Sequence, residues 1–267
     1  MNTTAATHTK VPGGVKIRGW TVTTNKGSIL KSTEKDEWEH QLALNELPEM
    51  VYGNNFVRLT HNETDLNIVF NAFDALSMCE KKADDSIKVS SSKKWQEINN
   101  SFGGAIEKSF DWTYSTPYCG SIIKNSQNLT NMKSDIIEET TEQIDIEKLK
   151  RPDPILFFDD VFLFEDELAD NGTSMLSIKI RVMNDSVFLL QRFFLRVDDV
   201  IIKSFDTRIY HEFGQQYLLR EFMVKESNYD IIKPYLEKDP TLATDVNFIY
   251  SKLPVKSVVT EKIIIHK

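Results

Sequence analysis

The sequence predicts an α+β fold, β-rich, with an antiparallel sheet core and short flanking helices. Apolar and polar side chains alternate in several segments, as they do in half-buried strands. Turn-forming residues separate these segments, which is typical of hairpins. The helical stretches between them are short and begin with capping residues. The length of 267 residues allows one large domain or two small ones.

The N-terminal region is predicted to contain a disordered tail and then a hairpin. Residues 1–14 are small and polar and end in glycine, so we expect a disordered tail. The stretch "VKIRGWTVTT" over 15–24 alternates and predicts one strand. The turn sequence "NKG" then leads into "SILKS" over 28–32, a candidate partner strand.

Two capped helices flank a pair of strands. We expect the first helix to begin at Thr33, with Asp36 as the reciprocal capping acid, and to end before Pro48. The segments "NNFVRLTH" and "LNIVFN" alternate as two strands. "NAFDALSMCEKK" then predicts a short helix, with Asn71 as N-cap and Asp74 at the third helical position.

The middle of the chain shows weaker signals. "SIKVS" predicts a short strand over 86–90, "SKKWQEI" a helical turn over 92–98, and "NNSFGG" a loop over 99–104. Residues 120–143 are mostly polar, so we expect a polar loop there. A loop of that length inside a domain is either functional or disordered.

The clearest signal is an antiparallel meander over residues 175–204. In "MLSIKIRVM" and "SVFLLQRFFLRV" apolar residues alternate with polar ones. A two-residue turn between them pairs Arg181 with Phe188 and Ser177 with Arg192. This register puts both apolar faces on one side of the sheet, so the pattern and the turn agree.

The second face of the meander mixes aromatic and cationic side chains. One interpretation is that another layer covers the aromatic rings while the arginine head groups reach solvent. The alternative is a recognition surface, since aromatic residues and arginine anchor many interfaces. The residues on this face are Lys179, Arg181, Phe188, Leu190, Arg192, Phe194 and Arg196.

The composition argues against several classes of partner. The net charge is −8 and the pI is about 5.3, which disfavours binding to phosphate backbones. No basic amphipathic helix or apolar run of membrane-spanning length is evident, so we expect neither nucleic acid nor membrane as a partner. Without a secretory signal, and with only 2 cysteines, the chain is expected in the cytoplasm or nucleus.

Motifs for catalysis, metals and cofactors are missing from the sequence. The acidic cluster around residues 159–170 does not fit a calcium loop, because Leu168 and Ser177 occupy ligand positions. No histidine pair has zinc-binding spacing, and no P-loop, GxGxxG or GxSxG motif is present. We interpret the acids as a solvated turn that continues through Asn171 and Gly172, with a hydrolase using them as the alternative. No cofactor is expected.

Two polar groups of residues are candidate binding sites. One is Asp74, which could instead be only a helix-capping acid. The other is "DTRIYHE" over 206–212, which offers Asp206, Arg208, Tyr210, His211 and Glu212, and in which Asp206, Arg208 and Tyr210 alternate onto one side of an extended chain. This second group either braces the end of the meander, through an Asp–Arg pair and a Tyr–His hydrogen bond, or binds the polar groups of a partner.

Seven segments stand out for their length and their order along the chain: "LPEMVYGNN", "FNAFDAL", "DWTYST", "IDIEKLKRPDPILFFDDVFLFEDELADNG", "SIKIRVM", "FLLQRFFLRVD" and "DTRIYHE". In this order they resemble the TOR signalling pathway regulator-like family (TIPRL), whose members regulate type 2A protein phosphatases. The resemblance runs from about residue 47 to 227 and becomes loose in the C-terminal 40 residues.

The resemblance implies a single non-catalytic regulatory domain over residues 15–267. Such a protein binds the catalytic subunits of type 2A-like serine/threonine phosphatases, receives their C-terminal tail in a cleft, and restrains their activity in TOR signalling. It implies partner-binding roles for Asp74, Ile144 and Asp206, beside which Arg208, Tyr210 and His211 are further candidates. A departure is Ser204-Phe205, where the family commonly has Met-Asn. A scaffold for another regulatory subunit is the remaining alternative.

Overall fold

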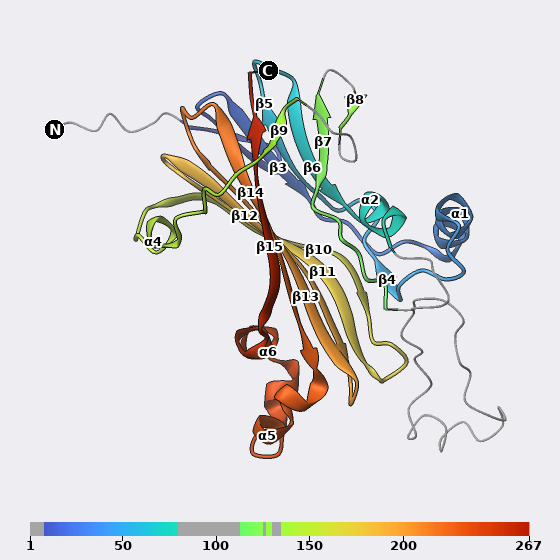
Figure 1. The fold of residues 1–267 in the computed structure, drawn as a ribbon. Helices are drawn as coiled ribbons and strands as arrows, with labels where there is room; N and C mark the ends of the chain where they lie inside the picture. The colour runs from blue at the N-terminus through green and yellow to red at the C-terminus, as the bar shows by residue number, and fades with distance from the viewer. Residues whose placement is uncertain (1–7, 80–112, 125–126, 130–134, 267) are drawn as a thin grey trace.

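The computed structural model describes residues 8–79, 113–124, 127–129 and 135–266 (Figure 1). These residues form two antiparallel sheets whose facing sides share one hydrophobic core, with short helices at the periphery. The chain is a single α+β domain with a β-rich core, as the sequence predicts. No helix of the described residues is both long and apolar enough to span a membrane.

The smaller sheet is built mainly from the N-terminal part of the chain. It has 7 strands in the order β1-β2-β3-β5-β6-β7-β8. Their bounds are β1 Thr9–Val11, β2 Gly14–Ile17, β3 Trp20–Asn25, β5 Phe56–His61, β6 Leu66–Asn71, β7 Ser121–Lys124 and β8 Gln127–Asn128.

The larger sheet contains the predicted meander. It has 8 strands in the order β4-β10-β11-β12-β13-β14-β15-β9. Their bounds are β4 Met50–Val51, β9 Ile137–Glu139, β10 Ile155–Asp166, β11 Gly172–Met183, β12 Ser186–Val197, β13 Ile201–Glu212, β14 Tyr217–Asn228 and β15 Val255–Ile264.

Short helices lie at the edges and ends of the sheets (Figure 1). The α-helices are α1 Ser32–Leu42, α2 Ala72–Ser77, α4 Ile146–Leu149, α5 Lys233–Leu236 and α6 Val246–Lys252, and the 3-10 helices are η1 Tyr229–Ile231 and η2 Pro240–Thr244. Figure 1 shows α4 near one end of the long strands of the larger sheet, and α5 and α6 near the other end.

The two faces of the larger sheet have different roles. Its inner face packs on the smaller sheet, and the alternate residues Leu189, Phe193 and Leu195 of β12 are completely buried there. Its outer face carries two smaller apolar clusters. One holds Phe194 beneath α6, and the other holds Tyr210 beneath Ile144.

The predicted meander and its register are confirmed. Arg181 pairs with Phe188 and Ser177 pairs with Arg192. β12 has the predicted bounds, β11 begins earlier, at Gly172, and β13 continues to Glu212. β10, β14 and β15 extend the sheet on both sides of the meander. β5, β6 and the start of α2 also agree with the sequence, and Asn71 Oδ1 accepts the Asp74 backbone N–H at 2.8 Å.

The N-terminal prediction needs two corrections. Residues 9–14 belong to a hairpin of β1 and β2, whereas we expected disorder over 1–14; residues 1–7 lie outside the described part. The single strand expected over 15–24 is instead β2 and β3 joined by a turn. Arg18 and Gly19 take positive φ angles of 45° and 83°, which is the backbone that a two-residue hairpin turn requires.

The first helix is confirmed, but its ends and the preceding segment differ from the prediction. α1 begins at Ser32, Glu34 rather than Asp36 accepts the Lys31 backbone N–H at 2.8 Å, and the helix ends at Ala43 with a left-handed residue. Residues 28–32 form no strand, because β5 rather than this segment pairs with β3.

The segment 120–143 is not one long loop. It contributes β7 and the edge strand β8 to the smaller sheet, and the edge strand β9 to the larger one. β7, β8 and β9 have 4, 2 and 3 residues, which is too short for a clear alternation of apolar and polar side chains, so the sequence gives little sign of them. The elements predicted over 86–90, 92–98 and 99–104 lie outside the described residues.

Candidate functional site

Four charged side chains form a continuous row across the outer face of the larger sheet. Arg192 of β12 lies opposite Asp206 of β13, and Arg208 of β13 lies opposite Glu221 of β14. We call these four residues the charged row. Opposite charges on neighbouring strands of one face attract each other across the sheet.

Asp206 is the most enclosed member of the row, with 1% of its surface exposed. Its carboxylate accepts two hydrogen bonds from Arg192, at 2.8 and 2.7 Å, and one from Ser204 Oγ at 3.0 Å. Burial alone would lower the pKa of Arg192, but the hydrogen bonds and attraction of Asp206 raise it. The Arg192 guanidinium therefore gains more from Asp206 than it loses through burial.

Tyr250 of α6 covers the row from above. Its ring centre lies 3.7 Å from the guanidinium carbon of Arg192, and its hydroxyl accepts a hydrogen bond from Arg208 at 3.2 Å. Asp245 caps α6 by accepting the Phe248 N–H at 2.9 Å. The helix is thereby anchored beside the row with its tyrosine over both arginines.

The other end of the row holds residues 140–145, which we call the Ile144 segment. The buried Ile144 N–H donates to Glu221 Oε1 at 2.7 Å, and the Ile144 side chain packs with Tyr210 and Leu219. Arg208 Nη1 lies 3.8 Å from Glu221 Oε2 and its Nη2 lies 4.0 Å from Asp206 Oδ2. Contacts therefore run without a break from the Ile144 segment to α6.

Two hollows lie beside the charged row on the outer face. One, of about 190 Å³, is lined by Phe162, Met175, Ser177, Lys179, Leu190, Arg192, Val246 and Asn247. The other, of about 160 Å³, is lined by Glu142, Gln143, Asp145, Lys148, Tyr210, Glu212, Gln215, Tyr217 and Leu219. The first is walled partly by α6 and the second by the Ile144 segment and α4.

The second face of the meander fits only in part the interpretation that another layer covers its aromatic rings while its arginine head groups reach solvent. A second layer does cover the aromatic residue Phe194, which is completely buried. The arginine head groups, however, bond to the covering elements instead of reaching solvent. Arg181 donates to the Leu149 carbonyl at 2.8 Å, and Arg196 donates to the Ala243 carbonyl.

The structure places His211 apart from the other residues of its motif. His211 lies on the inner face of β13 and is 2% exposed. Trp20 Nε1 donates to its Nε2 at 3.0 Å, and its Nδ1 lies 2.9 Å from the Tyr217 carbonyl, so the neutral ring satisfies both contacts. Burial lowers its pKa to about 4. His211 therefore joins the two sheets, and the expected Tyr210–His211 pair does not form.

Asp74 belongs to a separate region on the smaller sheet. Its carboxylate accepts hydrogen bonds from Asn71 Nδ2 at 2.9 Å and from Ser121 Oγ. The reciprocal bonds between Asn71 and Asp74 confirm the predicted helix start, and Ser121 adds a contact from β7 that the sequence did not indicate. No contact among the described residues joins Asp74 to the charged row.

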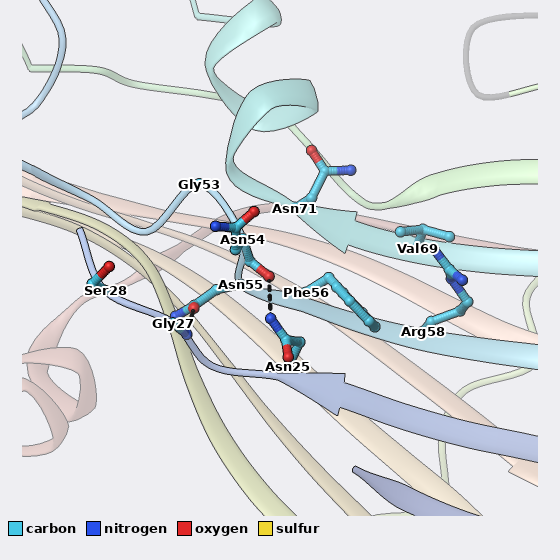
Figure 2. A pocket seen from close by; sticks show the side chains of 10 residues that line it. All are labelled: Asn25, Gly27, Ser28, Gly53, Asn54, Asn55, Phe56, Arg58, Val69 and Asn71. Carbon is cyan, nitrogen blue, oxygen red and sulfur yellow. Dashed lines mark hydrogen bonds between the residues drawn. The ribbon is translucent and has the colours of Figure 1, made fainter. Parts of the chain in front are cut away.

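Asn71 also lines an open pocket of about 490 Å³ (Figure 2). Figure 2 shows amide side chains around it: Asn25 donates to the Asn54 carbonyl at 2.8 Å, and Gly27 N–H donates to Asn55 Oδ1 at 2.6 Å. Arg58 reaches its rim, with the guanidinium carbon 5.0 Å from the Phe56 ring centre. The pocket is polar and shallow, unlike the enclosed charged row.

The acidic cluster around 159–170 does not form a solvated turn throughout. Asp159 accepts from Lys26 and Thr24, both at 2.5 Å. Asp166 is 4% exposed and accepts the backbone N–H groups of Glu49 and Leu168 at 3.0 and 2.7 Å. Burial raises its pKa to about 6.

These acids therefore tie neighbouring segments together. Within the described ranges, no three histidine, cysteine or acidic side chains are grouped as metal ligands.

Two residues of the outer face, Glu221 and Tyr250, are functional candidates that the sequence did not predict. Glu221 lies in the alternating stretch "YLLREFMVKESN", where it is one of several charged residues. Tyr250 lies in a short helix within the region where the resemblance is loose. Neither has a local signal, because each acquires its role only from residues distant in the chain.

Comparison with known proteins identifies the family. A model of the TIP41-like family matches residues 50–233, which include α2, the Ile144 segment and the whole charged row. A TIP41-like protein of Dictyostelium discoideum is 65% identical over 99% of this chain and 98% of its own length.

More distant relatives extend the comparison. A TIP41-like protein of Homo sapiens is 42% identical over 92% of this chain and 87% of its own length. A protein of Saccharomyces cerevisiae named type 2A phosphatase activator TIP41 is 38% identical over 90% of this chain and 72% of its own length.

Proposed function

The chain belongs to the TIP41-like family, and from this premise we propose that it is a non-catalytic regulator that binds the catalytic subunits of type 2A-like serine/threonine protein phosphatases. The observation that carries the proposal is the family match over residues 50–233. The name of the yeast relative, type 2A phosphatase activator, supports the choice of partner.

The outer face of the larger sheet suits an extended polypeptide. Lys179 and Arg192 line one of the hollows, and both hollows have partly apolar walls, so a segment with carboxylate and apolar side chains would find partners for both. We propose that the C-terminal tail of the phosphatase lies along this face. Ile144, Asp206, Arg208 and Tyr210 would then form or shape the contact, while the buried His211 would contribute only to the fold.

Asp74 would be a second point of contact. It is half-buried and lies next to the open pocket, so a partner could reach it without rearrangement of the sheets. Two separated contact regions imply a partner large enough to reach both, such as a folded catalytic subunit together with its tail.

The family resemblance and the name of the yeast relative point to opposite directions of regulation. The family resemblance implies restraint of phosphatase activity, whereas the yeast relative's name says activator. We propose restraint, in TOR signalling and in the cytoplasm or nucleus, with stoichiometric binding as its basis.

A titration with the purified type 2A catalytic subunit tests the proposal. We expect saturable 1:1 binding, weaker binding when the C-terminal tail of the subunit is deleted, and a fall in phosphatase turnover as the complex forms. Rising turnover would reverse the proposed direction, and no binding at micromolar concentrations would refute the function.

The two alternatives give different results in the same preparation. A hydrolase would turn over phosphoester or glycoside substrates by itself, and Asp159→Asn or Asp166→Asn would abolish that turnover. A scaffold would recover another regulatory subunit from lysate in the absence of the catalytic subunit. The structural partners of Asp159 and Asp166 weigh against the hydrolase, because both carboxylates are already hydrogen-bonded.

A further inference from the structure

Glu221 is the member of the charged row that no sequence motif singles out, and it contacts the Ile144 segment directly. It is 5% exposed, and its Oε1 accepts the buried N–H of Ile144 at 2.7 Å. A carboxylate acceptor makes a stronger and shorter hydrogen bond than a neutral one. The Ile144 segment contains no helix or strand in the described structure, so this bond is a main constraint on its backbone.

The remaining contacts of the Ile144 segment lie away from Ile144 itself. Glu142 accepts from Tyr217 Oη at 2.8 Å and lies 2.7 Å from Lys262 Nζ, both near the edge of the sheet. Asp145 uses its side chain to cap α4, at 3.0 Å from Glu147 N. At the edge of the sheet, the Thr140 N–H also donates to the Thr260 carbonyl at 3.0 Å. Between Glu142 and Asp145, the Glu221 bond and the packing of the Ile144 side chain on Tyr210 and Leu219 hold the segment over the sheet.

We propose that Glu221 is a positioning residue that makes the Ile144 segment and the Asp206–Arg208 pair one binding surface. The inference rests on the proposed phosphatase-binding function. Glu221 acts by accepting the Ile144 N–H with one oxygen while the other lies near Arg208. It need not touch the partner, because it sets the height of Ile144 above the sheet and the direction of the Arg208 side chain.

Glu221 positions the Ile144 segment through its hydrogen bond rather than through its charge. Arg208 also has Tyr250 Oη at 3.2 Å and Asp206 at 4.0 Å, so its guanidinium keeps partners when Glu221 loses its charge. The buried Ile144 N–H has no comparable substitute, and burying an unpaired donor is costly. Glu221→Gln keeps an acceptor of similar shape, whereas Glu221→Leu removes it.

Amide hydrogen exchange in the free protein tests the positioning without a partner. We expect Glu221→Leu to speed exchange at Ile144 and its neighbours by about 10- to 100-fold, and Glu221→Gln to change it by less than about 3-fold. Glu226→Leu is the matched control on the same strand. Glu226 pairs with Lys203 at 3.4 Å on the inner face, away from the Ile144 segment.

Titration with the type 2A catalytic subunit tests the consequence for binding. We expect Glu221→Leu to weaken binding by at least about 10-fold, with Glu221→Gln and Glu226→Leu close to the unsubstituted chain. In an Ile144→Ala background, Glu221→Leu should weaken binding little further, because the side chain that the Glu221 bond positions is already absent. In an Asp74→Leu background, its full effect should remain.

The outcomes separate this inference from the function on which it rests. Equal losses for Glu221→Gln and Glu221→Leu would overturn it in favour of a charge effect, and unchanged exchange at Ile144 in Glu221→Leu would overturn it outright. If the unsubstituted chain does not bind the phosphatase, the proposed function fails, and the exchange measurement alone decides the positioning role. Thermal melts of all variants identify any loss that comes from unfolding.

Discussion

The two sheets hold their candidate partner-binding carboxylates in different ways. On the larger sheet, Asp206 is buried and shared between Arg192 and Ser204, beneath a tyrosine from a distant helix. On the smaller sheet, Asp74 is half-buried, and its main partner, Asn71, is three positions earlier in the chain. The two acids have the same proposed role, but we expect the loss of Asp206 to lower the stability of the fold more than the loss of Asp74.

This difference follows from the distance along the chain over which each site is assembled. The charged row needs residues from three strands, the Ile144 segment and α6, so it exists only when the larger sheet is complete. The Asp74 site needs one helical turn and a single contact from β7. Substitutions in the two regions should therefore separate stability from binding.

The largest effect is expected for Asp206→Asn. The substitution leaves Arg192 buried beside a neutral side chain, and breaking a buried ion pair in this way costs about 3 kcal/mol or more of unfolding free energy. Urea unfolding measures the loss. A change below about 1 kcal/mol would contradict a stabilising role for the Arg192–Asp206 pair in the larger sheet.

His211, which joins the two sheets through Trp20, predicts a loss of stability on acidification that is similar in size to the effect of Asp206→Asn. His211 has a pKa of about 4 in the folded protein against an ordinary value of 6.5. The unfolded chain therefore binds the proton first as pH falls, and folded stability is lost between about pH 6.5 and 4, by about 3 kcal/mol in total. Urea unfolding across this range should show a flatter decline for His211→Gln.

Asp166 acts in the opposite direction over part of the same range. Burial raises its pKa from 3.8 to about 6, so the folded chain holds a proton that the unfolded chain releases. Its contribution is present below pH 3.8 and is lost as pH rises through about 6. Asp166→Asn should therefore steepen the loss of stability on acidification, whereas a shallower loss would contradict the sign.

A smaller effect on stability is expected at the smaller sheet. Asp74→Leu should cost about 1 kcal/mol of unfolding free energy, comparable to the loss of a helix cap, because α2 keeps its N-cap Asn71. Binding to the phosphatase should nevertheless weaken by about 30-fold, as for loss of a hydrogen-bonded interface carboxylate. Asn71→Ala is the control: it removes the cap but retains Asp74. Equal binding losses in both would mean that only the cap matters.

The smallest effect is expected for Asp160→Asn. Asp160 lies on the outer face of the larger sheet, 3.3 Å from Lys179, and the Lys179 side chain is 55% exposed. An ion pair this exposed contributes less than about 0.5 kcal/mol, because water and salt screen it. A melting temperature indistinguishable from that of the unsubstituted chain is expected. A large fall in the melting temperature of Asp160→Asn would show that the position of an acid on the outer face, rather than its burial, governs the loss of stability in Asp206→Asn.

Local pattern predicted a large part of the fold. The register of β11 and β12 follows from strict alternation around a short turn, since a shift by one residue would expose every core side chain. The start of α2 follows from Asn71 and Asp74, because capping is completed within a few residues. β1 was missed, because it has only 3 residues, none of them buried, and it is held in place by its pairing with β2.

The candidate site was predicted only in part. Sequence reasoning named Asp74, Ile144, Asp206, Arg208 and Tyr210, and the last four meet on the outer face. His211 was grouped with them, although the alternation of β13 turns it inward toward Trp20. Alternation predicts that neighbours face opposite ways, but it does not say which side a second sheet will cover.

The sequence by itself determined the β-rich class, the meander with its register, the capped α2 and the family. Each of these depends on neighbouring residues or on long, ordered motifs. Only the tertiary structure decided that residues 120–143 supply edge strands to both sheets, that Asp166 is buried, and that Glu221 and Tyr250 complete the charged row. The physical reason is that a hydrogen bond or ion pair between residues such as 144 and 221 depends on where the folded backbone brings them, and neither residue carries that information in its own surroundings along the chain.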